Sequence, residues 1–452
     1  MSEVKVNKIS PRTNCGTVQL GDSGDTFTIP AGATITNNGT AAGFGATGAA
    51  SWDTTVKTAS FTGVAGVGYF VNTTSGAITV TLPASPAAGA VVAVSDYAGT
   101  ADTNNITIGR NGSNINGAAA DQIISIENSA VTLVYVDGTQ GWKATDTSNL
   151  NDIELQPTYV TATGGTITCC GDYKVHTFTG PGTFCVSAVG NPAGSTSVDY
   201  LVVAGGAGGS FGGGGAGGYR ESSGAASGCY AASPLGACVS ALPVTTTGYP
   251  ITVGGGGAGR PSNANGSSSI FSTITSNGGG TGGGASTNNG PGIAGGSGGG
   301  GGHGPGTPVN AQPSGAGNTP PTSPAQGTPG GTGYQSGGNF GGGGGGGATV
   351  AGTNAVGGSP TSNTGGNGGT GATTSINGTP TTFAGGGGGA YYYNTCAGQA
   401  GAGGGGRSGI EGGGSDGATA GTTNTGGGGG GGNGTGKAGG SGIVIIRYKF
   451  QN

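Results

Sequence analysis

Apolar and polar residues alternate in short runs through residues 51–148, as in strands with one buried face. The runs are short, rich in β-branched side chains and separated by turn-forming residues. They predict strands at residues 57–62, 68–72, 77–82, 91–96, 105–108, 122–126, 130–136 and 141–144. We therefore expect an all-β module, sandwich-like or barrel-like, with Tyr135 and Trp142 in its core.

The first fifty residues carry shorter alternations, for example Val18 with Leu20 and Phe27 with Ile29. Each pair supplies too few apolar side chains for a core of its own. Three chains winding together would bury these side chains. Residues 1–50 are therefore predicted to form a short β-fibre segment in a homotrimer.

From residue 172 onward, apolar strands bracket a long glycine-rich stretch. Residues 173–178 and 182–189 flank a Gly-Pro-Gly turn and predict a β-hairpin. Further strands are expected to join it in a small sheet, at residues 199–203, 251–253 and 443–448. We interpret residues 149–171 as a linker and residues 172–452 as one domain anchored by that sheet.

Glycine makes up 116 of the 452 residues and is concentrated in blocks such as 205–218, 295–304 and 337–347. Glycine loses much backbone freedom on folding and buries no side chain. The stretch is therefore either a flexible linker or a fold whose core is hydrogen-bonded backbone. Charged residues are only 7% of the chain, and apolar strands bracket the blocks, which favours the ordered alternative. The absence of a Gly-X-Y period excludes collagen. We predict polyglycine-II helices packed side by side, with loops at both ends of the bundle.

Three runs around the blocks resemble the glycine-rich domain of bacteriophage tail fibres and adhesins. They are VDYLVVAGG from Val198, GGGAGGYR from Gly213 and GGSGIVIIRY from Gly439. The resemblance covers about residues 172–450. It implies a sandwich of polyglycine-II helices whose variable loops contact the host surface.

Two other stretches resemble parts of such fibres. Residues 1–50 are similar to the amino-terminal segment of fibre proteins from marine phages, notably those of cyanobacteria, which implies attachment to phage tail or particle proteins. The runs at 76–83, 105–113 and 132–137 are similar to a β-module common in tail fibres, which implies a spacer. Together these resemblances imply a virion-attached tail fibre, made in the host cytoplasm and released by lysis. Its loops would bind bacterial surface polysaccharide or an outer-membrane protein.

Composition excludes other classes. A net charge of −4 with 13 Lys and Arg gives no basic surface for nucleic acid. Long apolar stretches and an amino-terminal secretory signal are both missing, so we expect no membrane insertion. The seven cysteines lack zinc-site spacing and are expected to be free thiols. Cys229 and Cys238 are the best candidates for a bridge formed after release.

Catalytic groups are sparse. The two histidines are His176, expected to face the surface from a strand, and His303, which is expected at an end of the bundle. The 17 carboxylates include no convincing acid–base pair. No phosphate-loop lysine follows a glycine block. We therefore expect a protein that is not an enzyme, with no metal and no cofactor.

The candidate receptor-binding residues are aromatic and amide side chains between glycine blocks. Tyrosine supplies rigid, amphipathic contact area at low entropic cost. The candidates are Tyr391, Tyr392, Tyr393, Asn394, Tyr334, Gln335, Asn339 and Phe340. The same aromatics could instead cap the bundle or pack between loops.

Two other function classes share this composition. A structural filament or sheath protein would use the same loops to assemble with neighbouring chains and would bind no receptor. An ice-binding protein is the third class, and the long aromatic loops and the two preceding modules argue against it.

Overall fold

The computed structural model describes residues 26, 28, 50–147, 154–228, 230–284, 290–303, 312–336, 339–357, 364–392, 396–409 and 417–451. The predicted fibre segment at 1–50 therefore lies almost wholly outside the described residues. The chain divides into two compact units, residues 1–154 and 155–452. Both units are all-β, and the one helical element among the described residues is the short 3-10 helix η1 (Pro234–Gly236).

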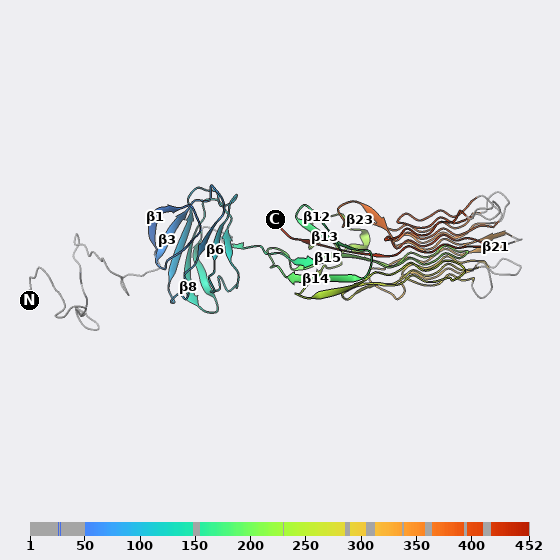
Figure 1. Ribbon diagram of the computed structural model, residues 1–452, viewed down its shortest axis with the longest axis horizontal. Helices are drawn as coiled ribbons and strands as arrows, with labels where there is room; N and C mark the ends of the chain where they lie inside the picture. The colour runs from blue at the N-terminus through green and yellow to red at the C-terminus, as the bar shows by residue number, and fades with distance from the viewer. Residues whose placement is uncertain are drawn as a thin grey trace, which may run out of the picture. The chain divides into compact units, whose positions relative to one another are not determined.

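The first unit contains two five-stranded sheets (Figure 1). One has the order β1 (Ser51–Lys57), β3 (Val67–Val71), β5 (Val91–Asp96), β8 (Ala130–Asp137) and β9 (Gly141–Thr147). The other has the order β10 (Glu154–Leu155), β7 (Gln122–Ile124), β6 (Ile106–Gly109), β4 (Ile78–Thr81) and β2 (Phe61–Thr62). Each sheet mixes parallel and antiparallel pairs: β3 pairs parallel with β5, whereas β5 pairs antiparallel with β8.

One hydrophobic core serves both sheets of this unit. Val92 and Leu133 from the first sheet lie in the same buried cluster as Val80 and Ile108 from the second. Trp142 is fully buried there, as predicted, and Tyr135 packs against it from a half-buried position with ring centroids 5.6 Å apart. Neither sheet closes into a barrel, so the barrel-like alternative is wrong for the described strands.

The strands of the second unit form two larger sheets and two small hairpins. One sheet has the order β11 (Thr161–Thr163), β14 (Gly182–Ala188), β18 (Gly248–Thr252), β19 (Ser269–Phe271) and β20 (Ile274–Ser276). The other has the order β12 (Thr166–Cys170), β13 (Tyr173–Phe178), β25 (Ile443–Lys449), β15 (Ser197–Val203) and β16 (Tyr219–Glu221), with β17 (Leu242–Pro243) pairing to β15. The hairpins are β21 (Tyr334–Ser336) with β22 (Asn339–Gly341), and β23 (Ala372–Thr374) with β24 (Thr381–Phe383).

The predicted hairpin of residues 173–178 and 182–189 is wrong. β13 pairs with β12 and β25, whereas β14 pairs with β11 and β18 in the other sheet. Phe178 and Phe184, one on each strand, lie in the same buried cluster. The two strands therefore meet through their side chains, because burying both phenylalanines between the sheets stabilises this arrangement. The partners β11 and β12 come from the stretch that the sequence suggested was a linker.

The continuous apolar run of β15 is explained by burial on both faces. Tyr200 and Val202 belong to the cluster between the two sheets, and Leu201 and Val203 belong to a second cluster on the opposite face. Side chains alternate across a strand, so residues 200–203, which are covered on both faces, are all apolar. β25 behaves in the same way, with Val444 and Ile445 in different clusters.

The glycine segments extend from this base of strands. Figure 1 shows the strands and the carboxyl terminus at one end of the second unit, with the glycine segments running side by side to the other end, where β21 lies. We call that far end the distal end and the set of segments the glycine array. The array is joined by backbone hydrogen bonds between segments remote in sequence.

Residues 213–218 lie in the middle of the array and are all buried. The N–H groups of Gly213 and Ala216 donate to the carbonyl oxygens of Gly343 and Gly346 in one neighbouring segment. Those of Gly214 and Gly217 donate to Gly429 and Gly426 in a second segment. Those of Gly215 and Gly218 donate to Gly280 and Asn277 in a third, and all six donor–acceptor distances are 2.8–3.0 Å. Successive N–H groups therefore reach three different neighbouring segments in turn, and the pattern repeats after three residues. Because neighbours approach from several sides, a Cβ atom has no room at Gly214, where it would lie 2.2 Å from the carbonyl oxygen of Ala207.

Candidate functional site

The predicted binding residues gather at the distal end. Gln335 of β21 and Phe340 of β22 are directly paired in the hairpin, with Tyr334 and Asn339 beside them. Tyr391 forms an isolated bridge with Gly341, and the N–H of Tyr392 donates to the carbonyl oxygen of Phe340 at 3.0 Å. The fold thus brings together candidates from two separate parts of the chain. Tyr393 and Asn394 lie outside the described residues.

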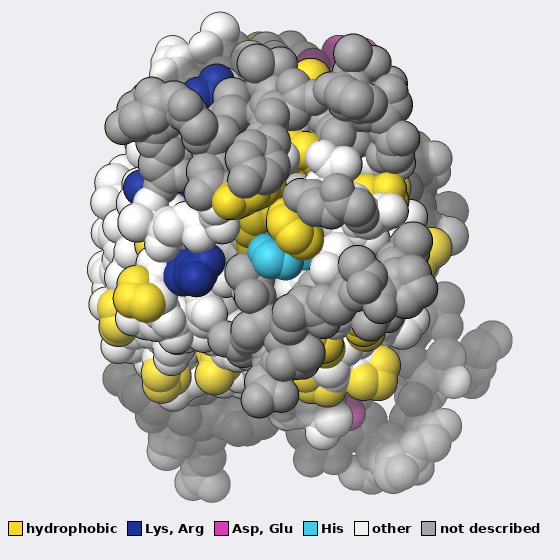
Figure 2. All heavy atoms as spheres, turned by 90° about the vertical axis from the view of Figure 1, so that its right-hand side faces the viewer, with side chains coloured by type: hydrophobic (Ala, Val, Ile, Leu, Met, Phe, Trp, Pro, Cys, Tyr) yellow, Lys and Arg dark blue, Asp and Glu magenta, His cyan; other side chains and the backbone are white. Residues whose placement is uncertain are grey.

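A row of rings in edge-to-face or tilted contact lies at this end. The ring centroids of Phe211 and His303 are 4.5 Å apart, those of His303 and Phe340 are 4.5 Å apart, and those of Phe340 and Tyr392 are 5.6 Å apart. Figure 2 looks onto the distal end and shows hydrophobic side chains gathered beside a histidine. We call Phe211, His303, Phe340 and Tyr392 the distal ring cluster.

Sequence analysis missed Phe211 because it sits inside a glycine block. The signal was present: Phe211 is the one bulky side chain between residues 205 and 218. The chain reverses there, since the N–H of Ser210 donates to the carbonyl oxygen of Gly212 at 3.0 Å. A bulky residue in a glycine block therefore marks the end of a segment, where side-chain volume can be accommodated.

Burial changes the electrostatics of the distal groups. Tyr391 is 1% exposed, and its hydroxyl has no hydrogen-bond partner among the described residues. Burial, assisted by the nearby Tyr334, raises the pKa of Tyr391 to about 12. Burial also lowers the pKa of His303, with Arg260 contributing, so this imidazole is neutral at pH 7. Tyr391 is thus a packing residue, whereas Tyr334, Asn339, Phe340 and Tyr392 are half-buried and reach the surface.

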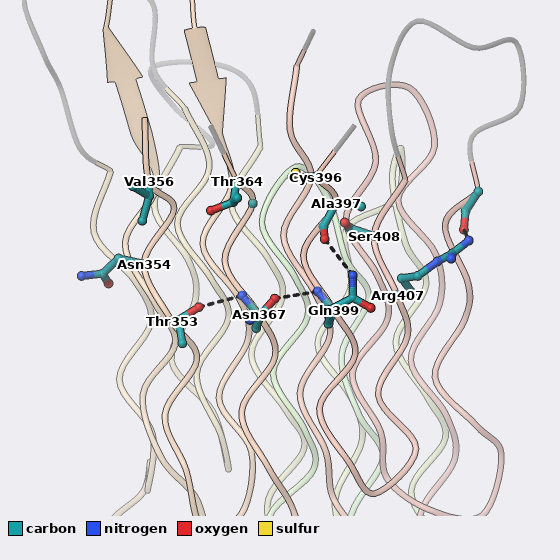
Figure 3. A pocket seen from close by; sticks show the side chains of 12 residues that line it. Thr353, Asn354, Val356, Thr364, Asn367, Cys396, Ala397, Gln399, Arg407 and Ser408 are labelled. Atoms are coloured by element: carbon teal, nitrogen blue, oxygen red, sulfur yellow. Dashed lines mark hydrogen bonds between the residues drawn. The ribbon is translucent and has the colours of Figure 1, made fainter. Parts of the chain in front are cut away.

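A second candidate site is a cleft on the side of the glycine array. It has a volume of about 750 Å³ and is lined by Thr353, Asn354, Val356, Thr364, Gly365, Asn367, Cys396, Ala397, Gln399, Arg407, Ser408 and Gly417. We call it the lateral cleft. Figure 3 shows Thr353, Asn367 and Gln399 side by side on neighbouring segments. Hydrogen bonds link them: the N–H of Asn367 donates to Thr353 Oγ1 at 2.7 Å, and the N–H of Gln399 donates to Asn367 Oδ1 at 2.8 Å.

Two buried ionisable side chains away from these sites, His176 and Glu221, have structural partners. His176 was expected at the surface, but it is fully buried between the two sheets. Its Nδ1 lies 2.7 Å from the carbonyl oxygen of Gly164, and its Nε2 lies 3.1 Å from the hydroxyl of Tyr448. Glu221 is also buried and accepts hydrogen bonds from Tyr219 and Ser233.

The described residues contain no group of three or more His, Cys, Asp and Glu side chains that could hold a metal ion. They also contain no helix with the length and apolar character needed to cross a bilayer. Cys238 is a free, exposed thiol, while Cys229 lies outside the described residues.

A family model described as a glycine-rich domain matches residues 177–449. The match begins within β13 and ends with β25, so it spans the glycine array, both candidate sites and the base of strands apart from β11, β12 and most of β13. No curated protein matches the chain.

Proposed function

The chain belongs to the glycine-rich domain family, and from this premise we propose that it is a virion-attached phage tail fibre. Its glycine-rich domain carries, at the distal end, the residues that bind a host cell surface. The observation that carries the proposal is the distal ring cluster, which lies at the end of the second unit opposite to its base of strands.

The glycine segments are polyglycine-II helices in this proposal. A polyproline-II-type helix has three residues per turn, so its N–H groups point in three directions and repeat after three residues. The donors of residues 213–218 follow that repeat. Glycine suits such close approach of three neighbours because it has no Cβ, although Ala216 shows that a single methyl group is accommodated at one position of the repeat.

The proposal also gives roles to the rest of the chain. The first unit is a β-sandwich that serves as a spacer, which its shared core between two sheets supports. Residues 1–50 attach the fibre to particle proteins, and three chains assemble as a homotrimer.

A rigid array suits a binding tip. Backbone hydrogen bonds hold the array together, so the residues at its end can vary without loss of the core. Half-buried Tyr334, Phe340 and Tyr392 are fixed by packing and lose little entropy on contact with a receptor. Bacterial surface polysaccharide and outer-membrane protein are the two receptor classes in this proposal.

The second candidate function is a structural filament without receptor binding. Ile293, Val350 and Val356 are large apolar side chains that are 45%, 50% and 55% exposed on the second unit. These side chains are available for lateral contacts between chains.

The test is binding of the purified full-length protein to a panel of bacteria, with particle shape followed by electron microscopy. We expect discrete trimers whose cell binding is lost in the double variant Tyr334→Ser/Phe340→Ser. Tyr97→Ser is the matched control, because Tyr97 is 57% exposed in the first unit. Unchanged binding by the double variant excludes the distal end as the binding site. Open-ended filaments that bind no cell favour the structural alternative.

A further inference from the structure

The lateral cleft is built on a three-residue interval in the sequence. Three segments carry side chains at this spacing: Val350, Thr353 and Val356; Thr364, Asn367 and Thr370; and Cys396, Gln399 and Ala402. All are exposed except Thr364, which is half-buried, whereas Gly365, Gly366 and Gly398 between them are buried. Side chains three residues apart therefore project to one face of the array, where they form a regular surface (Figure 3).

The polar side chains of this surface are held in place by the backbone. Asn354 Oδ1 accepts the N–H of Thr332 at 2.8 Å, and Asn367 Oδ1 accepts the N–H of Gln399 at 2.8 Å. Gln399 Nε2 donates to the carbonyl oxygen of Ala397 at 3.1 Å. Because these side chains are already ordered, a ligand would bind without the cost of fixing their rotamers.

Each of these side chains keeps one group unused. The Nδ2 donors of Asn354 and Asn367 and the Oε1 acceptor of Gln399 have no hydrogen-bond partner among the described residues. The exposed surface therefore offers two unused donors and one unused acceptor on neighbouring segments. Such a row suits a ligand with several hydroxyl groups, since each hydroxyl both donates and accepts.

Arg407 supplies positive charge at the edge of the cleft. Its side chain is exposed, and Nη2 donates to the carbonyl oxygen of Gly417 at 3.3 Å. Its backbone N–H is held by Thr419 Oγ1 at 2.8 Å, which fixes the position of the residue. No described carboxylate forms an ion pair with it. A guanidinium in this state is suited to a carboxylate or a sulfate group.

We propose that the lateral cleft binds an anionic saccharide. Sugar hydroxyls contact the amides of Asn354, Asn367 and Gln399, and the acidic group of the saccharide pairs with Arg407. A peptide is the weaker candidate, because the common modes of peptide recognition use a sheet edge, an apolar or aromatic groove, or a cluster of arginines. The lining of the cleft contains one arginine, and its apolar part is limited to Val356, Cys396 and Ala397. The acidic group is a uronic acid carboxylate or a sulfate ester.

The experiment is calorimetric titration of the full-length protein with three probes: an oligogalacturonate, a sulfated dextran oligomer and neutral dextran. We expect saturable binding of an acidic probe and at least tenfold weaker binding of neutral dextran. Whether the oligogalacturonate or the sulfated oligomer binds distinguishes the two acidic groups. Failure of both acidic probes to bind overturns the proposal.

Two arginine variants test whether the acidic probe binds in the lateral cleft. Arg407→Ala is expected to weaken binding of the acidic probe roughly tenfold or more, as for loss of a charged hydrogen bond. Arg260→Ala is the matched control, because Arg260 is a second arginine on the array, bonded to the carbonyl oxygen of Asn433 at 2.6 Å. Equal losses in the two variants would mean non-specific attraction and would overturn the proposal, as would unchanged binding by Arg407→Ala.

A second substitution in the cleft keeps the hydrogen bond between Gln399 and residue 367. Asn367→Asp retains the acceptor for the N–H of Gln399 but removes the donor and adds negative charge, so we expect it to weaken binding of the acidic probe without lowering the unfolding temperature. Unchanged affinity in this variant contradicts the proposal. Binding by Tyr334→Ser/Phe340→Ser is expected to equal that of the wild type, so the cleft and the distal end are tested independently.

Discussion

The backbone N–H of Gly387 donates to the carbonyl oxygen of Gly214 at 2.9 Å, although the two residues lie in different blocks far apart in the sequence. Gly214 in turn donates to Gly429. One glycine thus joins three segments through its own peptide groups. The glycine array therefore has a core of backbone, and its stability depends on the absence of side chains at particular positions.

Substitution of an interior glycine should be far more costly than substitution of an outer one. In Gly344→Ala the new Cβ would lie 1.9 Å from the carbonyl oxygen of Asn367, whereas a Cβ at Gly255 meets nothing within 4 Å. We expect Gly344→Ala to destabilise the protein by about 1–3 kcal/mol or more, as overpacked sites do, and Gly255→Ala to be near neutral. Scanning calorimetry of both variants checks this. Equal transition temperatures would contradict a close-packed backbone core.

His176 should make the second unit less stable in acid. Burial lowers its pKa in the folded state, so the unfolded chain binds a proton that the folded chain resists. Its contribution is complete above about pH 6.5, the ordinary pKa of histidine, and is lost as the pH falls through the lowered folded value. His176→Gln should flatten the decline in unfolding temperature between pH 7 and pH 5.

His303 also has a lowered pKa, so some decline remains in that variant. The double variant with His303→Gln should remove more of the slope. A decline identical to the wild type in His176→Gln would show that this histidine is not the acid-sensitive group.

Glu221 should act in the opposite direction. Burial raises its pKa despite hydrogen bonds from Ser233, Thr374 and Tyr219. A raised folded pKa gives stability that is complete below the unfolded pKa and is lost as the pH rises through the folded value. We expect the difference in unfolding free energy between the wild type and Glu221→Gln to shift in favour of the variant as the pH rises from 4 to 7. A pH-independent difference would refute the assignment.

Tyr391→Phe should be neutral or stabilising. The hydroxyl of Tyr391 is buried without a partner among the described residues, and removal of such a group relieves its desolvation cost of about 1–3 kcal/mol. Tyr391→Ala should lower the unfolding temperature, because it leaves a cavity beside Gly341. Thermal unfolding compares the two. Strong destabilisation by the phenylalanine variant would indicate that the hydroxyl does have a partner.

Much of the strand pattern could be predicted from the sequence, because the alternation of apolar and polar residues along a strand indicates which of its side chains are buried. It placed Trp142 in a core and identified the apolar runs that became β15 and β25. It could not identify strand partners. β13 and β14 look like a hairpin, yet β13 pairs with β25 near the other end of the sequence, and no local pattern encodes that choice.

The two candidate sites also differ in how far the sequence could predict them. Tyr334 and Tyr392 could be found because aromatic residues stand out among glycines, and the fold brings them to the same end. The lateral cleft could not, because Thr353, Asn367 and Gln399 are adjacent only across segments. Their three-residue spacing among glycines was the available signal, and it becomes informative once glycine segments are known to lie side by side.

The direction of the hydrogen bonds in the glycine array has a mechanical consequence. They join neighbouring segments that run from the base of strands to the distal end. A pull between these two ends acts along the segments and loads many such bonds together in shear, so that no bond is peeled open alone. The arrangement of these bonds therefore suits the domain to resist tension along its length.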